Sequence, residues 1–261
     1  MLTNIETSYK KIALNVAPPA ARITLANPPL NIIDLPMMDE LLEAIEHLDQ
    51  RSDISLLVLA GSERAFSAGV DIAAHARDRA RMMLTKMHSV IRAITATKKV
   101  TIAAVRGHCM GGGAELALVC DMVFCTETST WRFPEINLAC FPPVATVALS
   151  AVVGQKRAAE LILTGRTFHG DEAFHMGLAN DAVHEDELDH LVDEVGQRIV
   201  SLSPAALAFA KKAFYSCGPA ELDKRLENVE AIYFDELMRT EDAQEGIASF
   251  LEKRRPVWKG R

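Results

Sequence analysis

The run Gly111-Gly112-Gly113, followed by Glu115, could do chemistry on a negatively charged oxygen. It separates a short apolar segment from an apolar helix, so it should form a strand-to-helix turn. Glycines leave backbone N–H groups uncovered by side chains, and the positive end of the helix dipole favours an anion there. A carboxylate in the first turn could then move a proton beside a stabilised oxyanion. The alternative is a tight structural turn with an ordinary first-turn glutamate.

A second glycine-bearing loop, Ala65 to Asp71, also follows an apolar segment. Ligands bind at the carboxyl ends of parallel strands, so the two loops could face one site and each offer one N–H group to an oxyanion. Glu135 follows Pro134 at the end of a further predicted strand and lies 20 residues after Glu115, so only the tertiary fold could bring the two carboxylates together. For Glu135 alone, a solvated loop carboxylate is the alternative.

The elements that must position these residues alternate between strands and helices. Apolar runs bounded by turn residues predict strands, and apolar residues at a helical period predict amphipathic helices. This alternation favours an α/β fold with parallel strands and right-handed crossovers, preceded by a hairpin or a bent strand pair. The predicted strands are 11–16, 22–26, 56–61, 100–105, 122–125 and 131–136, and the predicted helices are 36–48, 82–94, 114–120 and 144–153.

After about residue 185 the pattern changes to helices alone. Helices are predicted over 205–215, 222–238 and 242–254, the last capped by Thr240 and stopped by Pro256. These features divide the chain into a core, residues 1–200, and a C-terminal helical region, residues 201–261. The helices carry enough apolar residues to predict packing against another subunit.

Composition narrows the possible partners. The chain has 261 residues and a formal net charge of −7, which disfavours nucleic acid and anionic membranes as partners. We expect no signal peptide and no membrane span, and the histidines lack the spacing of a metal site. These features predict a cytoplasmic protein. The cysteines form an odd set without a CxxC motif and are expected to be reduced thiols: Cys109, Cys120, Cys125, Cys140 and Cys217.

Several of these motifs, in this order, resemble the enoyl-CoA hydratase/isomerase (crotonase) superfamily. The resemblance begins near residue 10 and reaches the C-terminus. It implies a spiral of β-β-α units, with C-terminal helices that build a homotrimer or a dimer of trimers. The motifs are the two glycine loops, the Gly-Gly-Gly-Ala-Glu turn, Pro134-Glu135-Ile136, Leu163-Thr164-Gly165, Ala173 and Gly177-Leu178.

The resemblance also implies residue roles. Val70 and Gly112 match the positions whose N–H groups bind the thioester oxygen, and Glu115 and Glu135 match the two glutamates that hold and activate a water. Coenzyme A would be bound through Ala68 and Asp71 of the first loop and, near the C-terminus, by Phe250 and Lys253. For Lys253, a solvated lysine in a charged last turn is the alternative.

One segment departs from the hydratases of the crotonyl type. They usually have Pro-Gly and further glycines after the second glutamate, whereas this chain has Cys140-Phe-Pro-Pro-Val-Ala145. That segment resembles the cyclohexa-1,5-diene-1-carbonyl-CoA hydratases of anaerobic aromatic degradation. Its bulk predicts an acyl pocket shaped for a particular group and lined by Trp131, Phe133, Phe141 and Pro143. In the alternative, Pro143 simply begins a helix and the aromatic residues belong to the core.

The retained pair of glutamates favours hydration of an α,β-unsaturated acyl-CoA, most of all a cyclic dienoyl-CoA. No metal or redox cofactor is expected, because the thioester itself acidifies and polarises the carbon skeleton; coenzyme A is part of the substrate. The alternatives are a linear-chain hydratase, a double-bond isomerase that uses one glutamate, and a non-catalytic acyl-CoA-binding subunit. The acidic charge disfavours the RNA-binding role known for some relatives.

Overall fold

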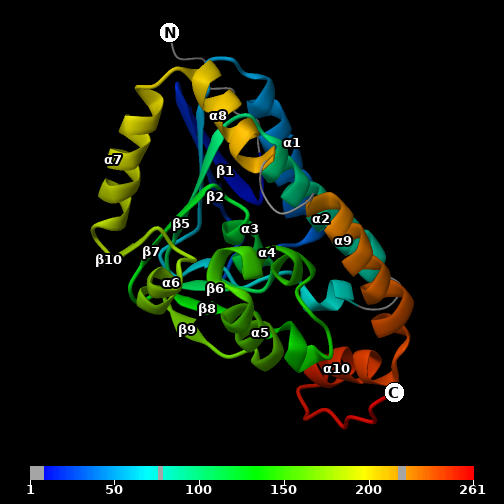
Figure 1. Ribbon diagram of the computed structural model, residues 1–261. Helices are drawn as coiled ribbons and strands as arrows, with labels where there is room; N and C mark the ends of the chain where they lie inside the picture. The colour runs from blue at the N-terminus through cyan, green and yellow to red at the C-terminus, as the bar shows by residue number, and fades with distance from the viewer. Residues whose placement is uncertain (1–8, 76–78, 217–221) are drawn as a thin grey trace.

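Two β-sheets form the centre of the molecule (Figure 1). The computed structural model describes residues 9–75, 79–216 and 222–261. The larger sheet has the order β1(Ile12–Ala17)-β2(Ala20–Leu25)-β3(Leu56–Ala60)-β5(Val100–Val105)-β7(Met122–Thr126)-β10(Asp181–Val183). The smaller sheet has the order β4(Ala65–Ser67)-β6(His108–Met110)-β8(Thr130–Arg132)-β9(Phe168–His169). β1 and β2 form the predicted antiparallel hairpin, and β2, β3, β5, β7 and β10 pair in parallel.

One unit recurs along the chain: a strand of the larger sheet, a strand of the smaller sheet, then a helix. β3 and β4 precede α2 (Ala80–Ala96), β5 and β6 precede α3 (Gly112–Leu118), and β7 and β8 precede α4 (Pro143–Val153). The strands β4, β6 and β8 pair in parallel, so the segments that follow β4 and β6 leave the same edge of the small sheet. The structure confirms the expected spiral of β-β-α units.

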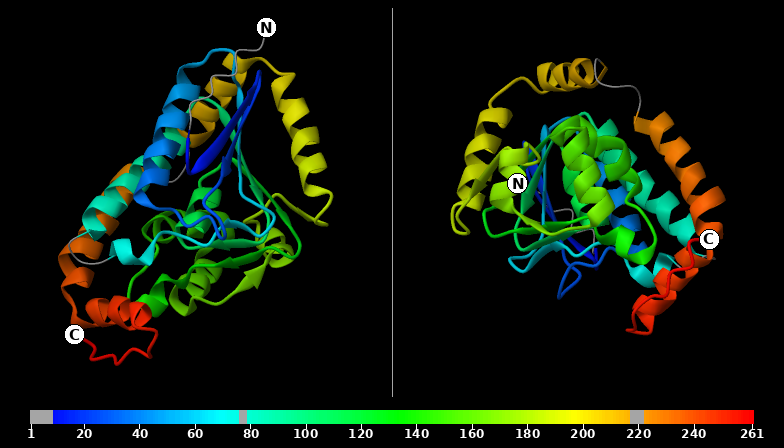
Figure 2. Two further views of the ribbon diagram at one scale, coloured as in Figure 1. Left: turned by 180° about the vertical axis from the view of Figure 1, so that it is seen from behind. Right: turned by 60° about the horizontal axis from the view of Figure 1, so that its bottom comes forward.

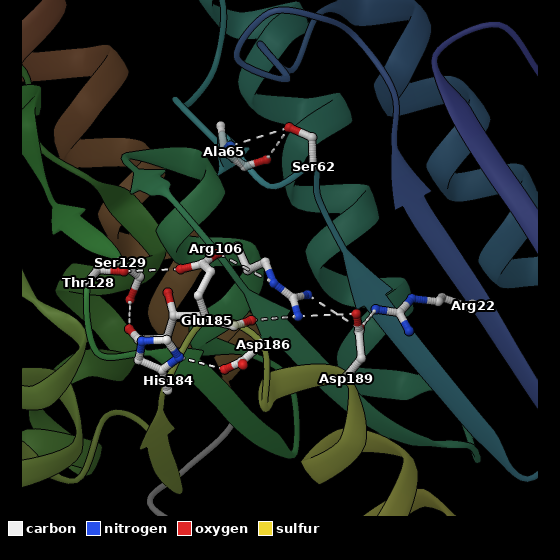
Figure 3. Close-up of polar contacts among 11 residues, drawn as sticks. Arg22, Ser62, Ala65, Arg106, Thr128, Ser129, His184, Glu185, Asp186 and Asp189 are labelled. Carbon is white, nitrogen blue, oxygen red and sulfur yellow. Dashed lines mark hydrogen bonds and ion pairs between the residues drawn. The ribbon is translucent and has the colours of Figure 1, made fainter.

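Both faces of the larger sheet are covered, which explains why β3 and β5 are buried at every position. The main core lies on the face toward α1 (Leu35–Gln50), α2 and α3. The other face packs against α7 (Leu188–Val200). At the start of α7, Asp189 accepts hydrogen bonds from Arg22 and Arg106, which ties the helix to strand β2 and to the end of β5 (Figure 3).

Local signals set most helix ends. Asp34 caps α1 by accepting a hydrogen bond from the Met37 N–H group at 2.9 Å. Gly154, at φ +81°, separates α4 from α5 (Gln155–Thr164), a helix that the sequence reasoning did not predict. The helix α6 spans Gly170–Met176. The predicted strand 131–136 ends at Arg132, because Pro134 begins the 3₁₀ helix η2 (Pro134–Leu138) that carries Glu135.

The C-terminal helices lie along one side of the core (Figure 2). The helix α9 (Leu222–Ala231) packs on α4 and joins α2 through a contact between His88 and Glu230. The predicted helix 222–238 changes at Ile232 into the π-helix η3 (Ile232–Glu236) and then the 3₁₀ helix η4 (Leu237–Arg239). The helix α10 (Glu241–Leu251) is capped by Thr240, as predicted. The helix α8 (Pro204–Ser216) has no buried residue.

The predictions from composition can be compared with the described residues. Cys109, Cys120, Cys125 and Cys140 are free and buried thiols, and Cys217 lies outside the described residues. None of the helices described is both long and apolar enough to cross a bilayer.

Candidate active site

The two glycine loops meet at the carboxyl ends of β4 and β6. Ser67 shapes the first loop, because its hydroxyl donates to the Asn31 carbonyl at 2.7 Å and accepts from the Gly69 N–H group at 3.1 Å. A Cβ atom on Gly112 would lie only 2.6 Å from Cγ2 of Val70, so the loops touch where the sequence places the oxyanion donors. Within the described residues, neither the Val70 nor the Gly112 N–H group has a hydrogen-bond acceptor. Two adjacent free donors can bind one carbonyl oxygen.

Glu115 lies in α3, three residues after Gly112, and is buried with 4% of its surface exposed. Its Oε1 accepts hydrogen bonds from the N–H groups of Val144 at 2.8 Å and Ala145 at 3.0 Å. These donors belong to the first turn of α4, whose N–H groups have no partner within the helix. Burial raises the pKa of Glu115 to about 7, although the two hydrogen bonds oppose the shift.

Glu135 approaches the same place from η2. A Cβ atom on Gly111 would lie 2.6 Å from Oε1 of Glu135, so a side chain at Gly111 would occupy the position of this carboxylate. Its other oxygen, Oε2, is buried without a hydrogen-bond partner among the described residues, although part of the residue is exposed. Burial, and then the charge of Glu115, raise the pKa of Glu135 to about 8, while nearby Arg132 opposes the shift.

The two carboxyl groups therefore share one environment and interact electrostatically. Two buried carboxylates that repel each other do not both ionise easily, so near neutral pH one group keeps a proton while the other is ionised. Such a pair supplies one general acid and one general base. The unpartnered Oε2 of Glu135 leaves a hydrogen-bonding position for a water or a substrate hydroxyl.

These raised pKa values predict how stability changes with pH. The folded state of Glu135 keeps its proton to about pH 8, whereas an unfolded chain loses it near the ordinary value of 4.5. Because the folded state binds this proton more tightly than the unfolded state, the free energy of unfolding falls as the pH rises from about 4.5 to about 8. Glu135→Gln, which mimics the protonated side chain, should gain stability relative to the unmodified protein from pH 5 to pH 8, by up to a few kcal/mol, since one pKa unit is about 1.4 kcal/mol.

Thermal or urea unfolding at several pH values measures this difference. Glu46→Gln is the matched control, because Glu46 is exposed on α1 and the same exchange there should give no comparable trend. A stability difference for Glu135→Gln that is constant from pH 5 to pH 8 would show that Glu135 ionises as it does in water.

The predicted coenzyme A residues lie in the first loop and near the end of α10. The N–H groups of Ala68 and Asp71 bond to the carbonyls of Leu30 and Ile33, so they are not available to a ligand. Phe250 is half exposed near the end of α10, a helix that packs on η1 (Ile72–His75) directly after the loop, and Lys253 is exposed just beyond the end of α10. Binding by these four residues remains a prediction.

The four predicted acyl-pocket residues separate into two pairs. Trp131 and Phe133 have no exposed surface, which favours the alternative that these two rings belong to the core. Side chains alternate along β8, and Trp131 points into the core, where its ring stacks on Phe168 and its indole N–H group donates to Ser129. Phe141 is partly exposed and lines a cavity, while Pro143 is buried and begins the helix that holds Glu115.

The sequence reasoning missed two contributions to the site. The N–H groups of Val144 and Ala145 hold Glu115, and the proline at the start of α4 was the signal that could have located them. Tyr233 lies near both glutamates and has no local signal, because only the tertiary fold brings the C-terminal region there. Among the described residues, no group of three or more His, Cys, Asp and Glu side chains could hold a metal ion.

Comparison with known proteins agrees with this geometry. The family model described as enoyl-CoA hydratase/isomerase matches residues 19–261. The chain belongs to this family. Among its relatives, the cyclohexa-1,5-dienecarbonyl-CoA hydratase of Thauera aromatica is 34% identical over 241 residues, which cover 92% of this chain and 93% of the relative. A probable enoyl-CoA hydratase of Mycobacterium tuberculosis is 35% identical over 237 residues, 90% of this chain and 92% of the relative.

Solved structures confirm the fold of this family member. A crystal structure of an enoyl-CoA hydratase from Mycobacterium avium subsp. paratuberculosis superposes with a TM-score of 0.86 at 25% identity, covering 96% of this chain and 99% of the other. A methylmalonyl-CoA decarboxylase superposes with a TM-score of 0.82 at 25% identity, covering 97% of this chain and 100% of the other. The family match and the hydratases among the relatives show that this chain is an enzyme of the hydratase type.

Proposed function

We propose that the enzyme adds water across the α,β-double bond of an acyl-CoA thioester, with Glu115 and Glu135 as the catalytic pair. The observation that carries this proposal is the meeting of two buried carboxyl groups of raised pKa with the free N–H groups of Val70 and Gly112. Two free donors suit an enolate oxygen, and a pair that holds one proton suits the addition of a water.

In the proposed reaction, negative charge develops on the thioester oxygen as water adds to the double bond. The thioester oxygen accepts hydrogen bonds from the Val70 and Gly112 N–H groups. Ionised Glu115, stabilised by the two N–H groups of α4, takes one proton from a water whose oxygen bonds to Cβ of the substrate. The C=C electron pair moves to form the enolate, whose oxygen the two donors stabilise. Protonated Glu135 then gives its proton to Cα, so one water has been added. No metal or redox cofactor is needed, because the thioester itself delocalises the charge.

We propose a cyclic dienoyl-CoA, cyclohexa-1,5-diene-1-carbonyl-CoA, as the substrate. Its support is the likeness to the Thauera aromatica hydratase and the presence of Phe141, Pro142 and Pro143 where a glycine-rich segment would leave more room. A linear enoyl-CoA is the competing substrate, because several relatives of similar identity are described only as probable enoyl-CoA hydratases.

A substrate panel tests both statements. The enzyme is assayed with crotonyl-, cyclohex-1-ene-carbonyl- and cyclohexa-1,5-diene-carbonyl-CoA, and each product is identified by mass. We expect the highest kcat/KM for the cyclic dienoyl-CoA and a product heavier by one water. A preference for crotonyl-CoA would contradict the proposed cyclic substrate but would still support hydration as the reaction. A product of unchanged mass would replace hydration with isomerisation on the same scaffold.

We also propose that the enzyme assembles as a homotrimer or a dimer of trimers. The support is α8 together with the segment before it, which leave large apolar side chains more than half exposed: Leu202, Phe209, Phe214 and Tyr215. Exposed apolar surface of this kind is typical of an interface between subunits.

A further inference from the structure

A cavity of about 520 Å³ lies between η2, α5 and the C-terminal helices. Its volume is in the range of pockets that hold small ligands. Its walls are mainly apolar, and neither glutamate is among them; they include Ile136, Phe141, Ile162, Val229, Ile232 and Leu237. The glutamates therefore do not line this cavity, although Cys140, which bonds to the backbone of Glu135, does.

The segment from Cys140 to Ala145 links the glutamates to the cavity. At one end, the Cys140 N–H group donates to the Glu135 carbonyl at 3.0 Å. At the other end, the Val144 and Ala145 N–H groups hold Glu115. Cys140 and Phe141 also line the cavity, so the segment contacts both the glutamates and the cavity.

Tyr233 of the π-helix η3 packs against this segment. Its ring packs edge to face against Phe141, with 5.2 Å between centroids and an interplanar angle of 77°, and only 1% of its surface is exposed. Burial, the nearby Cys140 thiol and the charges of Glu135 and Glu115 raise the pKa of Tyr233 well above its usual value. The tyrosine is thus a neutral phenol close to the catalytic pair, and the Phe141 ring against which it packs lines the cavity.

We propose that the ring pair of Phe141 and Tyr233 is the end wall of the acyl site, and that this wall limits the length of the acyl group the enzyme accepts. The inference rests on the proposed function. An acyl group whose carbonyl oxygen binds Val70 and Gly112 passes its Cα and Cβ between the glutamates, so its next atoms meet Cys140 and the ring pair. A compact group ends at the wall, and a longer chain needs the space behind it.

Opening the wall tests this inference. The length profile is the set of kcat/KM values for trans-2-enoyl-CoAs of four to ten carbons, measured for the unmodified enzyme and for Phe141→Ala. Burial of each methylene is worth roughly fourfold in binding, so the ratio of long-chain to short-chain kcat/KM should rise at least about tenfold in Phe141→Ala. Tyr233→Phe keeps both rings and should keep the ratio of the unmodified enzyme.

Filling the cavity provides the matched control. Val229 also lines the cavity, and Val229→Phe should cancel the gain when combined with Phe141→Ala. Alone, Val229→Phe should leave the length profile as it is, because a closed wall keeps the acyl group out of the cavity. If Val229→Phe alone shortens the profile, or if folded Phe141→Ala keeps the original profile, the wall has no such role.

A binding measurement separates this inference from the proposed reaction. The Kd values of saturated acyl-CoAs of the same lengths report the wall without any water addition. If the unmodified enzyme catalyses no hydration but Phe141→Ala still shifts the Kd values toward longer acyl-CoAs, the proposed reaction is contradicted and the proposed end wall is supported. Intact hydration with no shift in either measurement would overturn the wall alone.

Discussion

Replacing Glu135 with Gln is expected to lower kcat for hydration by about 10²–10⁴-fold, the range that a general acid or base supplies. The amide has nearly the same shape but no proton of suitable acidity to give to carbon. Because Oε2 of Glu135 has no partner among the described residues, the exchange breaks no hydrogen bond at that atom. Steady-state kinetics with the best substrate of the panel measures the effect, with Glu46→Gln as the matched surface control.

The partner exchange, Glu115→Gln, tests whether the two carboxyl groups act together. We expect a loss of similar size from it, and a double variant little worse than either single one, because groups that act as a unit are not additive. Glu115→Gln can also disturb α4, since an amide NH₂ group placed at Oε1 would face the Val144 and Ala145 donors. Turnover near that of the unmodified enzyme in either single variant would remove that glutamate from the catalytic pair.

Gly112→Ala is expected to lower kcat by roughly 10²-fold, because misplacing one oxyanion donor costs about as much as losing it. The new Cβ would lie 2.6 Å from Cγ2 of Val70, a methyl group on a stiff β-branched side chain. Relief of this overlap must move one loop relative to the other, and with it one of the two N–H donors. The measurement is kcat for hydration, with thermal unfolding to follow the change in stability.

A second substitution separates a displaced donor from a damaged fold. Val70→Ala removes both Cγ methyl groups, including the overlapping Cγ2, and keeps the backbone N–H group, so Gly112→Ala should cost much less activity in that background than alone. Equal losses in the two backgrounds would show that the overlap with Val70 is not the cause. The close approach of the loops would then have no part in holding the oxyanion.

The regular elements could be predicted because each depends on residues near it in the sequence. The apolar runs of β3 and β5 and the helical periods of α1 and α2 were sufficient, and Thr240 located the start of α10. The strand β4 has three residues and was read as loop, since so short a segment shows no period. The π-helix that begins at Ile232 has no local sequence signal, so the helix predicted over 222–238 runs through it without a break.

The site was predicted only in part, because its residues meet through the tertiary fold. The two glycine loops could be paired from the rule that ligands bind where parallel strands end, but Glu135 joined Glu115 only through a resemblance. Trp131 was predicted to line the acyl pocket from its residue type, whereas the alternation of side chains along β8 places it in the core. Tyr233 lies about a hundred residues beyond the glutamates in the chain, so no local pattern predicts their proximity.

The measurement that tests the central claim most directly is the transfer of labelled oxygen from water to the product. The enzyme is incubated with the unsaturated acyl-CoA in isotopically labelled water, and the product is analysed by mass spectrometry. If Glu115 and Glu135 hold the water that is added, the product carries one labelled oxygen at Cβ. Glu135→Gln should form this labelled product at least about a hundredfold more slowly. A product that carries no labelled oxygen, or labelling at the same rate in that variant, would contradict hydration by this pair.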